Sequence, residues 1–203
     1  AGQKNFAIKK AAGDWVLIVD ADERVTPGLA QKIREALDSS DSDGYEVIVA
    51  NFLFGKRLRH GGWHERHLRL LRKKFATYHG DVHEKFELPA SRVGRLDGEI
   101  WHLTHRTLPD TVKKTVLYAD LWADQMVREK HPRVRRKTLL AAPVKGFRDR
   151  YVRQRGYKDG FEGALAAGFH AFGLFYFYAT LWSKQRKPSL EDTYRKLDKE
   201  STS

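Results

Sequence analysis

Three acidic side chains stand together immediately after a run of apolar residues near the start of the chain. The run is Trp15 to Val19, and Asp20, Asp22 and Glu23 follow it. In open α/β sheets ligands bind beyond the carboxyl ends of strands, which is where a buried strand would place these acids. Carboxylate oxygens are ligands that Mg²⁺ and Mn²⁺ prefer, usually with substrate phosphates completing the shell. The pattern predicts a metal-bound diphosphate here, and a solvated turn that favours the next helix is the alternative.

Two further sets of polar residues follow along the chain. In the segment HGDVHEKF, residues 79–86, one ionisable group could act as a general base, although the segment by itself favours a polar surface hairpin. In the segment EIWHLTH, residues 99–105, a neutral imidazole could bind a metal or could be a hydrogen-bonded structural residue. The groups concerned are Asp81, His83 and Glu84 in the first segment and His102 and His105 in the second.

The elements that must position these groups follow from the apolar periodicity. Residues 3–12 have helical character, and the strand at 15–19 is apolar on both faces, as is typical of a central strand in a parallel or mixed sheet. Thr26 and Pro27 supply an N-cap and a first-turn proline for an amphipathic helix. A second apolar strand follows at 45–54. The order of strand, acidic loop and helix predicts an α/β fold.

The character of the chain changes near Arg106. We expect residues 1–106 to form the α/β part and residues 107–203 to be helical. The helical part contains a strongly basic segment, 133–158, and a segment without formal charge, 164–182. The apolar segment is nearly as long as the roughly 20 residues that span a bilayer. Its aromatic residues and the cations before it favour a position in the interface of an anionic leaflet, while burial in the protein and a spanning helix stay open.

Composition limits the partners. The chain has 203 residues with 41% apolar content, enough for a hydrophobic core, and it has no cysteine. Disulfides and thiolate metal sites are therefore excluded. The formal net charge of +12 predicts an anionic partner, which could be nucleic acid, an acidic membrane surface or a phosphate-bearing substrate.

A series of motifs in one order identifies a family resemblance. The chain carries QKNFAIKKAAGDWVLIVDADERVTPGLAQKI, RLLRK, VHEKF, GEIWHLTHRTLPDTVKKTVLYADLWA and PVKGFRDRYVRQRGYKDGFEGALAA. This series resembles the family 2 glycosyltransferases of lipopolysaccharide core biosynthesis, and most of all the bacterial glucosyltransferases that act on the inner core. The resemblance extends to about Trp182. It implies a GT-A fold with a Rossmann-like mixed sheet, a nucleotide-sugar donor, a divalent metal and inversion at the anomeric carbon.

The resemblance also implies roles for single residues. Asp20 and Asp22 match the Asp-x-Asp motif, with Asp22 the expected metal ligand and Asp20 expected near the ribose or sugar of the donor. Glu84 matches the acid of the Val-His-Glu segment and is the expected catalytic base. His102 matches the histidine that often completes the metal shell. His105 stands where relatives carry an aromatic residue, so no ligand role is transferred to it.

The basic run RLLRK supplies two further candidates. Arg69 and Arg72 could bind the donor diphosphate or an acceptor phosphate, and a solvated strand face is equally compatible with them. The family's first strands and helices, which hold the nucleotide base, should precede Gln3. The resemblance therefore implies an N-terminally truncated catalytic domain, residues 1–106, that is weakly active or inactive by itself, followed by an acceptor-facing helical region.

The expected partners follow from the same resemblance. They are UDP-glucose as donor, a lipopolysaccharide core or related glycolipid as acceptor, Mg²⁺ or Mn²⁺, and the cytoplasmic face of the bacterial inner membrane. Two other classes stay open, a non-catalytic membrane-associated scaffold and a basic nucleic-acid-binding module. The second is disfavoured because acids at a strand end would repel a phosphate backbone, so no nucleic acid is expected.

Overall fold

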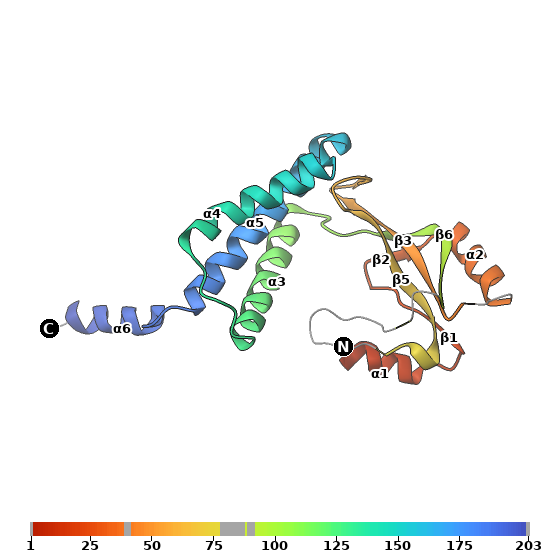
Figure 1. The fold of residues 1–203 in the computed structure, drawn as a ribbon, viewed down its shortest axis with the longest axis horizontal. Coiled ribbons are helices and arrows are strands. Elements are labelled where there is room, and N and C mark those ends of the chain that lie inside the picture. Colours follow the sequence, from red (N-terminus) through yellow and green to blue (C-terminus); the bar gives the residue numbers. More distant parts are fainter. Residues whose placement is uncertain (1, 39–41, 78–87, 89–91, 202–203) are drawn as a thin grey trace. The chain divides into compact units, whose positions relative to one another are not determined.

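A curled mixed sheet forms the first part of the chain (Figure 1). The computed structural model describes residues 2–38, 42–77, 88 and 92–201. The strands run in the order β1-β5-β3-β6-β2, and β4 pairs with β3 outside this path. The pairing of β3 with β6 is parallel, and the other pairings are antiparallel. The strands are β1 (Trp15–Leu17), β2 (Glu23–Val25), β3 (Gly44–Leu53), β4 (Lys56–Arg57), β5 (His64–Arg72) and β6 (Val93–His102).

The predicted α/β class with a mixed sheet is confirmed, and one prediction about the first strand is wrong. Within the described residues β1 pairs only with β5, so it lies at one end of the strand order rather than in the centre. The ladder is also shorter than predicted. Ile18 still donates a backbone hydrogen bond to Arg69, but Val19 is 40% exposed and lies outside the strand.

Two helices, α1 (Gly2–Lys10) and α2 (Pro27–Asp38), complete the sheet unit. The predicted cap of α2 is present, because the backbone N–H of Leu29 donates to Thr26 Oγ1 over 3.4 Å. Leu29 packs with Leu70 in one hydrophobic cluster. Ile8 of α1 packs with Leu71 in a second cluster. Because consecutive strand residues point to opposite faces, the two helices cover opposite faces of the sheet.

One glycine allows the close approach of α2 to β6. Gly98 has a φ of 111°, and a Cβ added there would lie 2.8 Å from the Cα atom of Leu29. An alanine at this position would therefore be strained in backbone conformation and would also clash with the helix. The glycine fixes α2 beside the strand that carries His102, which brings the turn before α2 next to the end of β6.

The second part of the chain is helical, and the contacts divide the protein into two compact units, Ala1–Thr104 and His105–Ser203. Thr107 caps the first helix of this unit by accepting a hydrogen bond from the backbone N–H of Asp110. The helices are α3 (Leu108–Arg128), α4 (Arg136–Arg148), α5 (Gly160–Lys184) and α6 (Leu190–Ser201), and short turns at Asp149–Arg153 and Gly156–Asp159 join α4 to α5. The assignment of this region as acceptor-facing stays a prediction.

Helix α5 is the centre of the helical unit, since α3 and α4 both pack against it. A Cβ added at Gly146 of α4 would lie 2.3 Å from Leu174 Cδ1 of α5, so the two helices approach closely there. Within the described residues one helical stretch, Gly156–Lys184, is long and apolar enough to cross a membrane by length and composition. Only 17% of its apolar window is buried, so α5 keeps exposed apolar surface even though two helices contact it.

Candidate active site

The acidic turn after β1 is closed by its own hydrogen bonds. The backbone N–H of Asp20 donates to Glu23 Oε2 over 2.8 Å, and the backbone N–H of Glu23 donates to the Asp20 carbonyl over 2.9 Å. The turn is also tied to β6, because the Leu103 N–H donates to the Asp22 carbonyl over 2.9 Å. The backbone of Asp22 is thus fixed at the carboxyl end of β6.

Arg69 of β5 balances the charge of this turn. Its Nη2 atom lies 2.6 Å from Glu23 Oε1, and its Nη1 atom lies 3.6 Å from Asp20 Oδ2. The Glu23 side chain is 1% exposed and the Arg69 side chain 15% exposed, so each needs the other's charge. Lys4 of α1 lies 3.3 Å from Asp20 Oδ1. Arg69, predicted to meet phosphate, is therefore placed where it orders the acidic turn.

Asp22 and His102 are brought together, as a shared metal site requires. Asp22 Oδ2 lies 3.4 Å from His102 Nε2. On the other side of the ring, His102 Nδ1 lies 2.7 Å from Asn51 Oδ1. Asn51 Nδ2 donates over 2.8 Å to the carbonyl of Trp63, which can only accept. Asn51 must therefore present its oxygen to the imidazole.

The hydrogen bonds of Asn51 determine the histidine tautomer. An amide oxygen accepts, so Nδ1 of His102 carries the hydrogen, and in the neutral ring Nε2 keeps its lone pair. That lone pair faces a carboxylate oxygen of Asp22, and two such electron-rich atoms repel unless a proton or a cation lies between them. In a metal-binding histidine, the ring N–H that does not face the metal usually donates to a carbonyl or carboxylate oxygen, which orients the ring. The donor set therefore fits a divalent cation.

The described residues offer this cation two side-chain ligands. Across residues 2–38, 42–77, 88 and 92–201, no group of three or more His, Cys, Asp or Glu side chains could hold a metal ion by itself. Mg²⁺ is typically bound by one or two protein ligands together with substrate phosphates and water. The pair of Asp22 and His102 suits a cation that arrives with, or is completed by, a diphosphate.

Arg72 lies elsewhere in the sheet unit. Its Nε atom is 3.3 Å from Asp43 Oδ1, and its guanidinium lies over the ring of Trp15, 4.8 Å from the centroid. Trp15 begins β1 whereas Asp20 follows its end, so the structure separates Arg72 from the acidic turn and brings only Arg69 to it. The role of Arg72 in donor binding stays a prediction.

Four other sequence candidates remain, and only one of them lies within the described residues. Glu84, the predicted catalytic base, lies outside the described residues, as do Asp81 and His83. His105 follows the last residue of the sheet unit and has a φ of 50°, in the left-handed region. It is the first residue of the helical unit, and the expectation that it has no ligand role stays a prediction.

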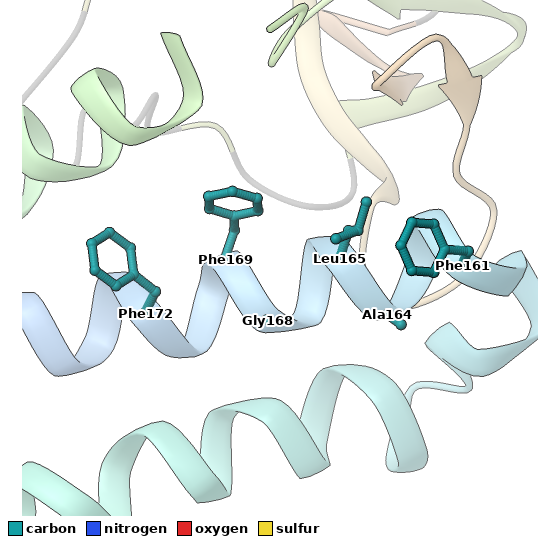
Figure 2. A pocket seen from close by; sticks show the side chains of 6 residues that line it. All are labelled: Phe161, Ala164, Leu165, Gly168, Phe169 and Phe172. Carbon is teal, nitrogen blue, oxygen red and sulfur yellow. The ribbon is translucent and has the colours of Figure 1, made fainter. Parts of the chain in front are cut away.

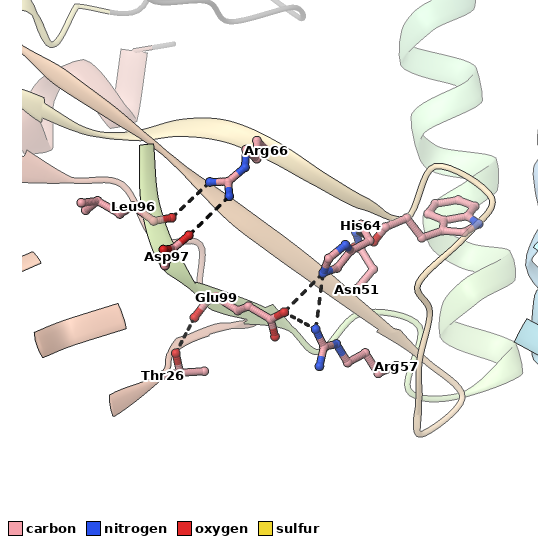
Figure 3. A network of polar contacts seen from close by, with 9 residues as sticks. Thr26, Asn51, Arg57, His64, Arg66, Leu96, Asp97 and Glu99 are labelled. Carbon is pink, nitrogen blue, oxygen red and sulfur yellow. Dashed lines mark hydrogen bonds and ion pairs between the residues drawn. The ribbon is translucent and has the colours of Figure 1, made fainter. Parts of the chain in front are cut away.

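A second polar cluster lies in the same sheet unit. Figure 3 shows Arg57, His64 and Glu99 converging from three strands. Arg57 Nη2 forms an ion pair with Glu99 Oε1, and His64 Nε2 lies 3.3 Å from the same oxygen. The Glu99 carbonyl accepts from Thr26 Oγ1 over 2.9 Å, which links the cluster to the cap of α2. In this cluster arginine compensates the carboxylate.

Two roles were not predicted from the sequence: Glu23 is the buried anchor of the acidic turn, and Asn51 orients His102. Asn51 is a polar residue near the end of the apolar strand predicted at 45–54, and that isolated polarity was an available signal. Nearby on β5, desolvation and then the charge of Arg69 lower the pKa of His67. This imidazole is therefore neutral at pH 7 and adds no positive charge to the site.

The chain was compared with known proteins. Residues 1–95 match the family model of Glycosyl transferase family 2. The chain is 30% identical over 200 residues to the lipopolysaccharide core biosynthesis glycosyltransferase LpsC of Rhizobium meliloti (strain 1021), covering 95% of this chain and 73% of that protein. It is 25% identical to an uncharacterized glycosyltransferase of Rickettsia typhi, with 95% and 71% covered. An uncharacterized glycosyltransferase of Rickettsia prowazekii is 24% identical, with 86% and 64% covered.

These similarities agree with the fold and with the order of the motifs. The family match covers most of the sheet unit, including the acidic turn and Arg69, and the similarity to LpsC runs through the helical unit as well. The mixed sheet with its two covering helices is consistent with the GT-A-like α/β fold that the resemblance implied. The chain belongs to the family 2 glycosyltransferases.

Proposed function

We propose that this protein is an inverting hexosyltransferase that moves glucose from UDP-glucose to a lipopolysaccharide core or related glycolipid acceptor. The observation that carries the proposal is the pair of Asp22 and His102, with the imidazole oriented by Asn51. Such a pair, at the end of β6 in a family 2 glycosyltransferase, suits a Mg²⁺ or Mn²⁺ ion shared with a nucleotide diphosphate. The name of LpsC supports the acceptor class.

The residues around the acidic turn have distinct roles in this proposal. Asp22 and His102 would hold the cation, and Asp20 would contact the ribose or the sugar of the donor. A bound divalent ion neutralises the negative charge that develops on the leaving diphosphate, typically worth several kcal/mol in the transition state. Arg69 and the buried Glu23 keep the turn in the geometry that this binding requires, because both side chains are largely withdrawn from water.

Glu84 is the proposed catalytic base, on the basis of its match to the Val-His-Glu motif. Its carboxylate takes the proton from an acceptor hydroxyl as that oxygen attacks the anomeric carbon. The bond from the anomeric carbon to the diphosphate oxygen breaks on the opposite face, so the configuration inverts and the nucleoside diphosphate leaves with the electron pair. Arg72 is a candidate for binding an acceptor phosphate.

The acceptor proposal places the protein at the cytoplasmic face of the bacterial inner membrane. The basic segment 133–158 suits an anionic leaflet, where each Lys or Arg near the surface contributes about 1 kcal/mol. A glycolipid acceptor would be embedded in that leaflet. The alternative of a non-catalytic scaffold at the same surface is distinguished by measuring sugar transfer and vesicle binding on one preparation.

Donor binding tests the proposed function directly. We expect calorimetry with UDP-glucose to show binding in the presence of Mn²⁺ and at least about tenfold weaker binding with EDTA. The variant Glu84→Gln should keep this donor binding and lose transfer to a lipopolysaccharide core acceptor, since only the base is removed. Transfer at the wild-type rate by Glu84→Gln would disprove the base assignment. Equal donor binding with and without the metal would disprove the metal site.

A further inference from the structure

Helix α4 presents an apolar stripe that faces away from the rest of the helical unit. Leu140 and Val144 are 71% and 70% exposed, and Phe147 is 36% exposed. Positions four and seven residues apart share one face of an α-helix, so these three side chains form a continuous stripe. The opposite face contains Gly146, which is buried against His170 and Leu174 of α5. Helix α4 therefore packs against α5 through the face that contains Gly146, and it exposes its large apolar side chains.

The charges on α4 have one sign. The helix sequence RKTLLAAPVKGFR contains no Asp or Glu. Its basic residues, Arg136, Lys137, Lys145 and Arg148, are all exposed. On a helical wheel these four residues flank the apolar stripe. Arg136 lies on one side of it, and the other three lie on the opposite side. An apolar stripe bordered by cations fits the boundary between headgroups and acyl chains of an anionic leaflet.

Helix α3 also exposes apolar side chains, but its charges differ. Leu117 and Leu121 are 57% and 48% exposed. Asp120 and Asp124 stand beside them, and both carboxylates lie within hydrogen-bond distance of Lys184, at 2.8 and 2.5 Å. Helix α3 carries as many acidic as basic side chains, three of each, whereas α4 carries basic ones alone. An anionic surface would therefore attract α4 more strongly than this face.

The third apolar surface is a groove along α5 of about 380 Å³. Figure 2 shows Leu165, Phe169 and Phe172 rising from the same side of the helix. The groove is lined entirely by apolar residues and glycine, with Phe161 72% exposed at one end. It offers hydrophobic contact without charge, so it provides no selectivity for an anionic leaflet. Charge therefore distinguishes the α4 stripe from both other surfaces.

We propose that α4 is the element that binds the membrane, lying parallel to an anionic leaflet with Leu140, Val144 and Phe147 inserted among the acyl chains. Its basic residues contact lipid phosphates, and the close packing at Gly146 holds α4 on α5 as a rigid support. The proposal deepens, and rests on, the membrane location included in the proposed function. It replaces the expectation that residues 164–182 are the interfacial element.

Vesicle binding by the full chain tests this assignment. Sedimentation is measured with vesicles of phosphatidylcholine containing phosphatidylglycerol and with vesicles of phosphatidylcholine alone. We expect the double variant Leu140→Ser/Val144→Ser to bind the anionic vesicles at least about tenfold more weakly than the wild type, because two inserted side chains are lost. The matched variant Leu117→Ser/Leu121→Ser on α3 should bind as the wild type does. Circular dichroism confirms that both variants keep their helices.

Each remaining outcome is decisive. Strong binding by Leu140→Ser/Val144→Ser, with loss of binding in Phe161→Ser/Phe172→Ser, would assign the membrane contact to the α5 groove and overturn the proposal. Equal binding of the wild type to neutral vesicles would overturn the role of the α4 cations. If the wild type binds neither vesicle, the membrane location fails as well. Donor calorimetry on the same preparations reports separately whether the transferase site is intact.

Discussion

Among its described residues the sheet unit contains two carboxylate–histidine pairs at the same end of β6, and they are built differently. Asp22 faces Nε2 of His102 at 3.4 Å, and Glu99 faces Nε2 of His64 at 3.3 Å. Glu99 and His102 belong to one strand, three residues apart in sequence. Arg57 forms an ion pair with Glu99 and also approaches His64, with 3.4 Å between Nη2 and Nε2. The residue that contacts the first pair is Asn51, and the residue that contacts the second pair is Arg57.

The neighbouring residue, Asn51 or Arg57, decides what each pair can bind. Arginine carries a permanent positive charge, so Arg57 satisfies Glu99 and would repel a metal ion. Asn51 is neutral and acts on the far side of the ring, so it orients His102 without occupying Nε2. Similar distances between a carboxylate and an imidazole thus belong to an ion-pair network at Glu99 and to the proposed metal ligands at Asp22.

The largest expected effect comes from removing the carboxylate of the first pair. Asp22→Asn should lower metal-dependent transfer at least about 100-fold, because an amide binds a divalent cation poorly and leaves the diphosphate charge unbalanced. The backbone carbonyl that bonds Leu103 is unchanged, so the turn should keep its shape. Transfer rates with saturating Mn²⁺ measure the effect. A rate within threefold of the wild type would remove Asp22 from the metal site.

A smaller effect is expected from the histidine. His102→Gln should weaken Mn²⁺ binding in the presence of UDP by roughly 10- to 100-fold, since a ligand is lost while Asp22 remains. His64→Gln is the matched control, because it makes the same substitution in the pair that arginine compensates. Electron paramagnetic resonance of free Mn²⁺ gives both affinities. Equal losses in the two variants would show that the two pairs do not differ as proposed.

The orienting residue should have an effect of about tenfold. Asn51→Leu removes the acceptor for His102 Nδ1, and loss of such outer contacts typically costs 10- to 100-fold in metal affinity. Asn51→Asp keeps an acceptor for the imidazole, although both variants lose the hydrogen bond to the Trp63 carbonyl. Mn²⁺ affinity should therefore fall in Asn51→Leu and be retained in Asn51→Asp. Equal weakening in both would assign the effect to the Trp63 contact instead.

The sequence predicted local features well where one residue type determines them. Thr26 and Pro27 begin α2, Thr107 caps α3, and the strand, acidic turn and helix follow in the predicted order, although the short strand β2, which was not predicted, lies before α2. It failed for β1, because an apolar run of a few residues does not show which strands pair with it. Pairing depends on contacts between residues distant in sequence, such as Trp15 with Arg72.

In the candidate site, too, the residues alone predicted local features and did not predict contacts between distant residues. The family resemblance predicted that Asp22 and His102 share a cation, and their proximity follows from the pairing of β2 with β6, in which Glu23 lies opposite His102. No local pattern predicted that Arg69, rather than Arg72, would reach the acidic turn. The two arginines stand three residues apart, and a register irregularity in the pairing of β3 with β5 intervenes near Tyr45 and Glu46.

The smallest effect on metal binding is expected from the second pair, and there the effect should appear in stability. Glu99→Gln should leave Mn²⁺ affinity within twofold of the wild type and lower the free energy of unfolding by about 1–2 kcal/mol. The side chains of Arg57 and Glu99 are 29% and 19% exposed, so water screens the pair only in part. Removing the carboxylate charge leaves the Arg57 guanidinium without its counterion in a site that is mostly withdrawn from solvent.

Urea unfolding of four proteins measures the interaction energy between Arg57 and Glu99. The proteins are the wild type, Glu99→Gln, Arg57→Gln and the double variant. If the charges of Arg57 and Glu99 stabilise each other, the double variant should be less destabilised than the sum of the single variants predicts. Mn²⁺ affinity should stay constant across the series, because Asn51, Asp22 and His102 are untouched. A fall in affinity that tracks the loss of Glu99 would mean that both carboxylates of this edge serve the cation. The distinction between an arginine-compensated pair and a ligand pair would then be wrong.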